Sequence, residues 1–126
     1  MDSAPFRHMI VADGFVSAHG NILNDGPAIS GFLRGLAERI GMNEIALHSH
    51  KVPAEIDSGP GWTMVDIITT SHISIHTFPR FSFFMLDVAS CKALDHDVAF
   101  GHIVDGLHVV EWRELFTRPE GMLTCL

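Results

Sequence analysis

Basic residues are scarce in this chain. Eight lysines and arginines stand against fifteen aspartates and glutamates among 126 residues, which gives a formal net charge of -7. The sequence contains no run of lysine and arginine, so it lacks the electrostatic footprint that binds the phosphates of nucleic acids. We therefore expect small-molecule or protein partners and no nucleic acid.

Long apolar segments are missing as well. Near the N-terminus, in MDSAPFRHMIVADG, the apolar stretch is only about four residues long, whereas a signal peptide or a membrane span needs a longer run. Internal repeats and low-complexity tracts are also absent. With 47% apolar residues, the sequence predicts one domain over residues 1–126 with one core, located in the cytoplasm and without membrane contact.

Cysteine is nearly absent, since the chain contains only Cys91 and Cys125. Two cysteines cannot form the disulfide framework of a small secreted domain, and Cys125 lies next to the last residue. We therefore interpret Cys91 as a free thiol.

Two segments have the apolar spacing of helices. Asp25 is placed to cap the first helix, with Pro27 in its first turn and Gly41 just past its end. Asp95 is placed to cap the second, which we expect to end near Leu107. The residues expected to face the core are Ile29, Phe32, Leu33, Leu36, Ala37 and Ile40 in the first helix, and Val98, Ala99, His102 and Ile103 in the second.

The remaining apolar segments are predicted strands, separated by a loop over 53–61. They cover 6–13, 43–52, 62–78, 82–90 and 107–115. No turn signal divides 62–78, which reads as one long strand or two, and 82–90 is apolar enough to be buried on both faces. The order β-α-β-β-β-α-β predicts an α+β fold, a two-layer sandwich with two helices packed on one face of an antiparallel sheet.

The hairpin within TTSHISIHTFPRFSFFMLDVASC carries an unusual number of reactive side chains. With its turn near Arg80, Ser71 should lie opposite about Ala89 and Cys91 opposite about Thr69, so that Ser71 and Cys91 become neighbours. His76, five residues after Ser71, should face the opposite side of the strand, about 16 Å away. If His76 serves Ser71, either the strand is bulged or the histidine comes from a second copy of the chain.

Residue types alone leave simpler interpretations open. A serine in a strand is usually a solvated edge residue, and a single cysteine is usually a small buried hydrophobic residue. His72 and His76 share one strand face, and His48 and His50 share another, which is a possible start for metal binding. No further ligand type at a diagnostic spacing accompanies them, so we do not expect a metal site.

The hairpin resembles the core of the short prokaryotic S-adenosylmethionine decarboxylase proenzymes. The family's S-H-x-x-I-H-T-x-P segment matches SHISIHTFP, and its aspartate four residues before a cysteine matches Asp87 and Cys91. RHMIVAD is similar to the family's first strand, and LHVVEW to its last one.

The resemblance implies that Ser71 attacks the carbonyl of Thr70 and that elimination leaves a pyruvoyl group at position 71. The chain would become a β chain of residues 1–70 and an α chain of residues 71–126, in a homodimer with shared active sites. His76 matches the histidine that supports processing, Thr63 falls where the family has an assisting serine, and Cys91 matches the proton donor of decarboxylation. The pyruvoyl ketone would capture the substrate's amine as a Schiff base. The resemblance also implies a role in polyamine biosynthesis.

The sequence departs from the family at three positions. Thr70 replaces a glutamate, Val52 replaces an aromatic residue that stacks on adenine, and Arg80 replaces a glutamate that binds ribose hydroxyls. A cation cannot accept those hydrogen bonds, so we expect poor use of S-adenosylmethionine. Alternatives are decarboxylation of arginine or ornithine on the same scaffold, and a non-catalytic, unprocessed paralogue that acts as a binding module.

Overall fold

The computed structural model describes residues 6–117, so Cys125 lies outside the described part of the chain. These residues form the order β-α-β-β-β-β-α-β. The strands are β1 (His8–Val16), β2 (Glu44–Val52), β3 (Gly61–Ile68), β4 (Ser71–Phe78), β5 (Phe83–Ser90) and β6 (Val109–Phe116); the helices are α1 (Gly26–Arg39) and α2 (His96–Leu107), and a single 3-10 turn, η1 (Pro79–Phe81), joins β4 to β5.

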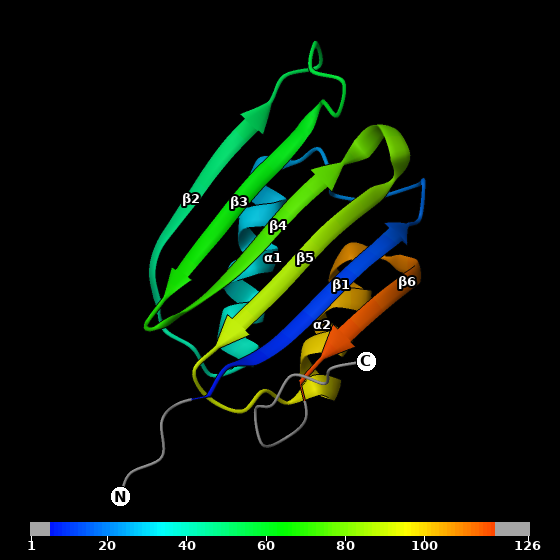
Figure 1. Cartoon of the computed structure of the whole chain (residues 1–126). Coiled ribbons are helices and arrows are strands. Elements are labelled where there is room, and N and C mark those ends of the chain that lie inside the picture. The colour runs from blue at the N-terminus through cyan, green and yellow to red at the C-terminus, as the bar shows by residue number, and fades with distance from the viewer. Residues whose placement is uncertain (1–5, 118–126) are drawn as a thin grey trace, which may run out of the picture.

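All six strands belong to one antiparallel sheet in the order β2-β3-β4-β5-β1-β6. Both helices cover the same face of this sheet (Figure 1). We call the other face the open face. The predicted α+β sandwich, with two helices on one face of an antiparallel sheet, is confirmed.

Both helices begin at the predicted caps. A side-chain oxygen of Asp25 accepts a hydrogen bond from the Ala28 N–H at 3.1 Å, and Asp95 accepts one from the Val98 N–H at the same distance. Each bond satisfies a backbone donor that the first helical turn leaves free. Five of the six α1 residues expected in the core are buried there, and Ile40 packs partly buried against them.

The inward stripe of α2 differs from the prediction at Val98, which is 38% exposed. Its core residues are Ala99, Phe100, Ile103 and Leu107. Val98 precedes this stripe by one residue, a rotation of about 100° around the helix, and so points away from the core. His102 is half-buried and stacks on Phe32 of α1.

Segment 62–78 is two strands, so the predicted order lacks one strand. The break falls at Thr69 and Thr70, and Thr70 has a φ of +56°. A β-branched residue is uncommon in this left-handed region, where turns usually place glycine or asparagine. The sequence therefore carried no turn signal at the point where the chain reverses.

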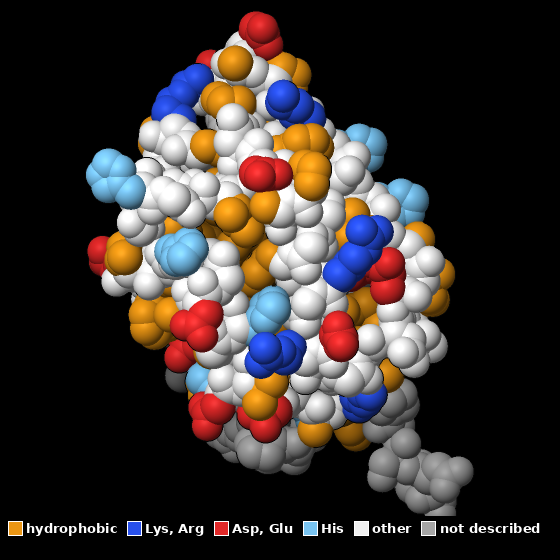
Figure 2. All heavy atoms as spheres, turned by 180° about the vertical axis from the view of Figure 1, so that it is seen from behind, with side chains coloured by type: hydrophobic (Ala, Val, Ile, Leu, Met, Phe, Trp, Pro, Cys, Tyr) orange, Lys and Arg blue, Asp and Glu red, His pale blue; other side chains and the backbone are white. Residues whose placement is uncertain are grey.

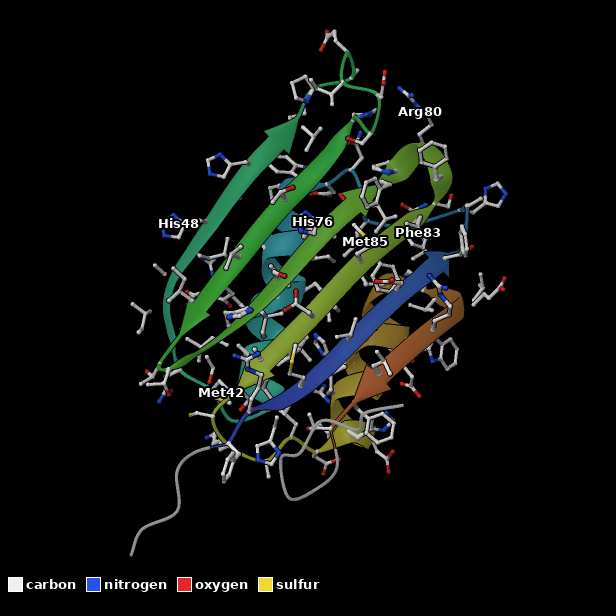
Figure 3. All side chains as sticks on the ribbon, viewed as in Figure 1. Met42, His48, His76, Arg80, Phe83 and Met85 are labelled. Atoms are coloured by element: carbon white, nitrogen blue, oxygen red, sulfur yellow. The ribbon has the colours of Figure 1, made fainter. Side chains whose placement is uncertain are left out.

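The expectation that 82–90 is buried on both faces is wrong. Burial alternates along β5, and Met85 is 37% exposed. The physical reason is that the helices cover only one face, so every second residue of β5 lies on the open face. Met85 lies there beside His76 of β4 (Figure 3).

The outer surface of the helix layer has mixed polarity. Acidic, basic and histidine side chains are interspersed over it, with hydrophobic side chains between them (Figure 2). Neither helix within residues 6–117 has the length and apolar character that crossing a bilayer requires.

Candidate active site

Ser71 and Cys91 are neighbours at one end of the sheet. The ladder between β4 and β5 pairs His72 with Ala89, so the register differs by one residue from the predicted pairing of Ser71 with Ala89. The backbone N–H of Cys91 donates a hydrogen bond to the Ser71 hydroxyl oxygen at 3.1 Å. The hairpin thus brings the serine and the thiol together, although they are twenty residues apart in sequence.

Thr70 completes this group. Its hydroxyl oxygen lies 2.9 Å from the Cys91 sulfur and 2.7 Å from the Thr69 carbonyl oxygen. Hydrogen bonds from the hydroxyls of Thr70 and Ser71 lower the pKa of the Cys91 thiol, the Lys92 ammonium adds to the effect, and partial burial opposes it. We call Thr70, Ser71 and Cys91 the cleavage-end cluster.

A depression of about 650 Å³ opens in front of the cleavage-end cluster. It has room for a small molecule. Its lining combines polar and apolar side chains from the start of the described chain, the β3–β4 turn and the end of β5, namely Phe6, Arg7, Met9, Thr70, Ser71, His72, Ala89, Ser90 and Cys91.

Thr63 and His76 form a second group, on the open face. The Thr63 hydroxyl lies 3.0 Å from Nδ1 of His76, across the β3–β4 ladder. Strand alternation separates this pair from the cleavage-end cluster, because Ser71 shares its parity with the core residues Ile73 and Ile75. Within one chain, His76 therefore lies on the opposite face from Ser71, five residues or about 16 Å along β4.

Val52 and Arg80, the two positions expected to contact substrate, lie farther still from Ser71. β4 begins at Ser71 and ends just before η1, a span of about 23 Å. Arg80 Nη1 donates a hydrogen bond to the backbone oxygen of Asp57 at 3.4 Å, and Figure 3 shows Arg80 at the η1 end of the sheet. One protomer therefore does not bring Val52 and Arg80 to the cleavage-end cluster.

A third polar group lies on the open face, between the cleavage-end cluster and the pair of Thr63 and His76. Asp87 of β5 accepts a hydrogen bond from the Ser74 hydroxyl and lies 3.3 Å from Nε2 of His72. The sequence contains the signal for it, since His72 and Ser74 alternate on one strand face and the hairpin register places Asp87 opposite Ser74. His72, which contacts Asp87, also lines the depression that holds Ser71.

Asp66 of β3 is a buried carboxyl group that sequence reasoning missed. It is fully buried (0% exposed), and neither side-chain oxygen has a hydrogen-bond partner among residues 6–117. Its pKa is raised from 3.8 to about 7, chiefly by burial and also by the Glu44 carboxyl, while the Arg34 guanidinium opposes the shift. Asp66 alternates with the core residues Met64 and Ile68, and this parity is the signal that could have revealed it.

The histidines considered for metal binding do not converge within the described part of the chain. Residues 6–117 contain no group of three or more histidine, cysteine, aspartate or glutamate side chains that could hold a metal ion. His50 lies beside Thr63 in the β2–β3 ladder, and His48 lies two residues away on the same edge strand.

Residues 8–114 match the protein-family model described as S-adenosylmethionine decarboxylase. The chain belongs to this family.

Individual relatives carry the same description. The S-adenosylmethionine decarboxylase proenzyme of Bacillus velezensis is 42% identical over 62 residues, which cover 49% of this chain and 48% of that protein, so the match spans about half of that relative's length. The proenzyme of Saccharolobus islandicus is 34% identical over 88 residues, 69% of this chain and 67% of that one. The proenzyme of Bacillus cytotoxicus is 34% identical over 100 residues, 79% of this chain and 72% of that one.

A solved structure shares the fold. The crystal structure of the adenosylmethionine decarboxylase from Aquifex aeolicus matches with a TM-score of 0.73 and 22% identity, over 97% of this chain and 96% of that one. The resemblance seen in the hairpin motif is thus confirmed for the family and for the fold. In this member of the S-adenosylmethionine decarboxylase family, the SHISIHTFP segment covers β4 and the first residue of η1, Asp87 lies on β5, and Cys91 directly follows β5.

Proposed function

We propose that this chain is a pyruvoyl-dependent decarboxylase that cleaves itself between Thr70 and Ser71. The observation that carries the proposal is the hydrogen bond from the Cys91 backbone N–H to the Ser71 hydroxyl oxygen at 3.1 Å, which sets the thiol beside Ser71 directly after a turn residue in the left-handed region. The residues present suit a serine-derived pyruvoyl group, because position 71 faces a depression of about 650 Å³ beside a thiol. Thr70's positive φ also places strain next to the bond to be cut.

Cleavage would begin with attack of the Ser71 hydroxyl oxygen on the carbonyl carbon of Thr70. The peptide C–N bond breaks, an ester forms, and the nitrogen of residue 71 becomes an amine. Loss of the Cα proton and of the ester oxygen then releases the Thr70 carboxylate and leaves a dehydroalanine, which takes up one water and releases ammonia. The products are residues 1–70 and residues 71–126, the second beginning with a pyruvoyl group.

The pyruvoyl group supplies an electron sink for the loss of carbon dioxide from an α-amino acid. The chain's own residues must then supply a proton to the substrate carbon. The Cys91 thiol is next to position 71, since the backbone N–H and the side chain of Cys91 both contact Ser71. His76, held by the Thr63 hydroxyl at 3.0 Å, is a proton carrier for the cleavage step.

We further propose a homodimer with shared active sites. Thr63 and His76 occupy the open face, whereas Ser71 has the core-facing parity at the end of β4. Because Ser71 stands at the very end of β4 and lines a depression there, a second copy packed on the open face and across this strand end would bring its own Thr63 and His76 toward Ser71. The open face also carries exposed apolar residues that such packing would bury, among them Phe15, Ile67 and Met85.

The substrate class follows from the family. The relatives' names make S-adenosylmethionine the first substrate to test. The expectation of poor activity on it stays a prediction, since it depends on whether a second copy brings Val52 and Arg80 to the pyruvoyl end. A cytoplasmic location likewise stays a prediction from the sequence.

Denaturing mass spectrometry of the purified protein tests the proposal. We expect two fragments, 1–70 and 71–126, the second with the mass of a pyruvoyl N-terminus. Ser71→Ala should remain one chain, and Ser49→Ala, which changes an exposed serine on the edge strand β2, should still be cleaved. A wild-type chain that stays intact after long incubation would favour the non-catalytic binding module, and cleavage of Ser71→Ala would refute the role of the serine.

A further inference from the structure

The hydroxyl group of Thr70 has two competing partners. Its oxygen lies 2.7 Å from the Thr69 carbonyl oxygen and 2.9 Å from the Cys91 sulfur. A hydroxyl group has one proton to donate but can also accept. If the Thr70 proton goes to the Thr69 carbonyl, the sulfur can remain in contact only by donating its own proton to the Thr70 oxygen. If the sulfur is a thiolate, the Thr70 proton must turn toward it.

We propose that Thr70 is a positioning residue for Cys91. The Thr70 hydroxyl accepts a hydrogen bond from the thiol and donates one to the thiolate, and so holds the sulfur beside position 71 in both protonation states. The proposal rests on the proposed function, because it assigns Cys91 a proton that must be kept and then delivered. It concerns a position where this chain departs from the family's glutamate, since a threonine can donate to a thiolate and an ionised carboxylate cannot.

Before cleavage, the surroundings of Cys91 lower the pKa of its thiol relative to an ordinary cysteine. The hydroxyls of Thr70 and Ser71 lower the pKa of the thiol, and the cation of the adjacent Lys92 acts in the same direction. Arg7 and His72 line the same depression, which has no carboxylate among its described lining residues. Asp87 reaches its rim only through His72, at 3.3 Å.

Cleavage would reverse this balance. The Thr70 carbonyl becomes a carboxylate on the residue whose hydroxyl contacts the sulfur, and the Ser71 hydroxyl disappears when residue 71 becomes a ketone. A negative charge a few ångströms from a thiol disfavours the thiolate. At a surface-like dielectric, the effect on the thiol corresponds to about one pH unit or more. Self-cleavage would thereby raise the pKa of the Cys91 thiol, so that the thiol holds its proton more firmly until the substrate takes it.

The rate of Cys91 alkylation by iodoacetamide, measured against pH, reports the thiolate directly. A Cys125→Ser background removes the second thiol. In Ser71→Ala, which keeps the chain whole, Thr70→Val should raise the midpoint of the alkylation profile by about half a unit or more. Thr70→Ser, which keeps a hydroxyl group, should restore the original midpoint. Thr70→Ala is the second variant in case valine prevents folding.

The second comparison is between Ser71→Ala and the cleaved protein, both of which lack the Ser71 hydroxyl. The cleaved protein should have the higher midpoint, by about one unit or more. The positioning role would be overturned if the alkylation midpoint were the same in the parent with Thr70, in Thr70→Val and in Thr70→Ala. The effect of the new carboxylate would be overturned if the midpoint of the cleaved protein were not higher than that of Ser71→Ala. If the wild-type chain is never cleaved, the proposed function fails, while the Thr70 variants still decide whether this hydroxyl controls the thiol.

Discussion

The buried carboxyl of Asp66 predicts that the protein becomes less stable as pH rises from about 4 to 7. Asp66 is fully buried without a hydrogen-bond partner among the described residues, and its pKa is raised from 3.8 to about 7. Between these values the folded chain holds a proton that the unfolded chain releases. The free energy of unfolding therefore falls with rising pH in this window and becomes level above it.

The magnitude follows from the shift. One pKa unit corresponds to 1.36 kcal/mol, so a difference of about three units corresponds to about 4 kcal/mol at the limit. Local relaxation and water entry reduce the cost of a buried charge. The pKa of about 7 already includes the opposing effect of the Arg34 guanidinium, which binds Glu44 at 3.1 Å. Between pH 5 and 8 we expect a loss of about 1 to 3 kcal/mol attributable to Asp66.

Asp66→Asn removes the titration and nearly preserves the shape. At pH 5 the variant's free energy of unfolding should be about 1 kcal/mol lower than that of its parent, because a buried amide also needs hydrogen-bond partners. Relative to the parent, the variant should then gain about 1 to 3 kcal/mol by pH 8, and the order of stability should invert.

Urea unfolding, followed by circular dichroism at several pH values and one protein concentration, measures this difference. The Ser71→Ala background keeps the protein a single chain, so that linear extrapolation applies to one transition. Glu55→Gln, in the exposed loop before β3, is the control and should leave the pH dependence unchanged. Parallel pH profiles for Asp66 and Asp66→Asn would refute the assignment of a neutral buried carboxyl group.

Three further predictions concern the proposed reaction. Cys91→Ala should still be cleaved yet lose most decarboxylation, and undiminished release of carbon dioxide would remove Cys91 from the mechanism. Ser71→Ala co-expressed with His76→Ala should show some cleaved chain, because a mixed dimer contains one complete site; mixed dimers without any cleavage would contradict shared sites. Arg80→Glu should raise kcat/KM for S-adenosylmethionine by about tenfold to a hundredfold, since it restores a charged acceptor, and an unchanged value in cleaved protein would show that Arg80 does not face the substrate.

Local signals in the sequence predicted most of the fold. The caps at Asp25 and Asp95 are backbone-to-side-chain bonds over three residues, so the sequence contains both partners. The break at Thr70 was not predictable, because its left-handed conformation is imposed by the two strands that it joins. Met85 was assigned to the core because apolarity does not reveal which face of a strand the helices cover.

The site was predicted only in part, because some of its contacts lie within the hairpin and others join elements that are far apart in the sequence. The contact between Ser71 and Cys91 needed only the hairpin and its approximate register, and an error of one residue did not separate them. The contact of Thr63 with His76 needed the neighbouring β3–β4 ladder, whose turn the sequence did not show. Asp66 has the core parity of Met64 and Ile68, a local signal of burial that was not used. Its raised pKa was not predictable, because Glu44 and Arg34, which also affect it, come from other elements.

The order of strands in the sheet determines whether the two fragments would stay together after self-cleavage. Residues 1–70 supply β1, β2 and β3, and residues 71–126 supply β4, β5 and β6. In the sheet these sets interleave, with β1 between β5 and β6 (Figure 1), so three of the five strand boundaries, β3–β4, β5–β1 and β1–β6, would join different polypeptides. Neither product could leave without dismantling the core. Once denatured, however, the two would have to find each other by diffusion, so that refolding would depend on concentration, unlike the first folding of the uncut chain. After cleavage the folded state would therefore persist as long as the strands stay paired, but once lost it would re-form only by association of two separate chains.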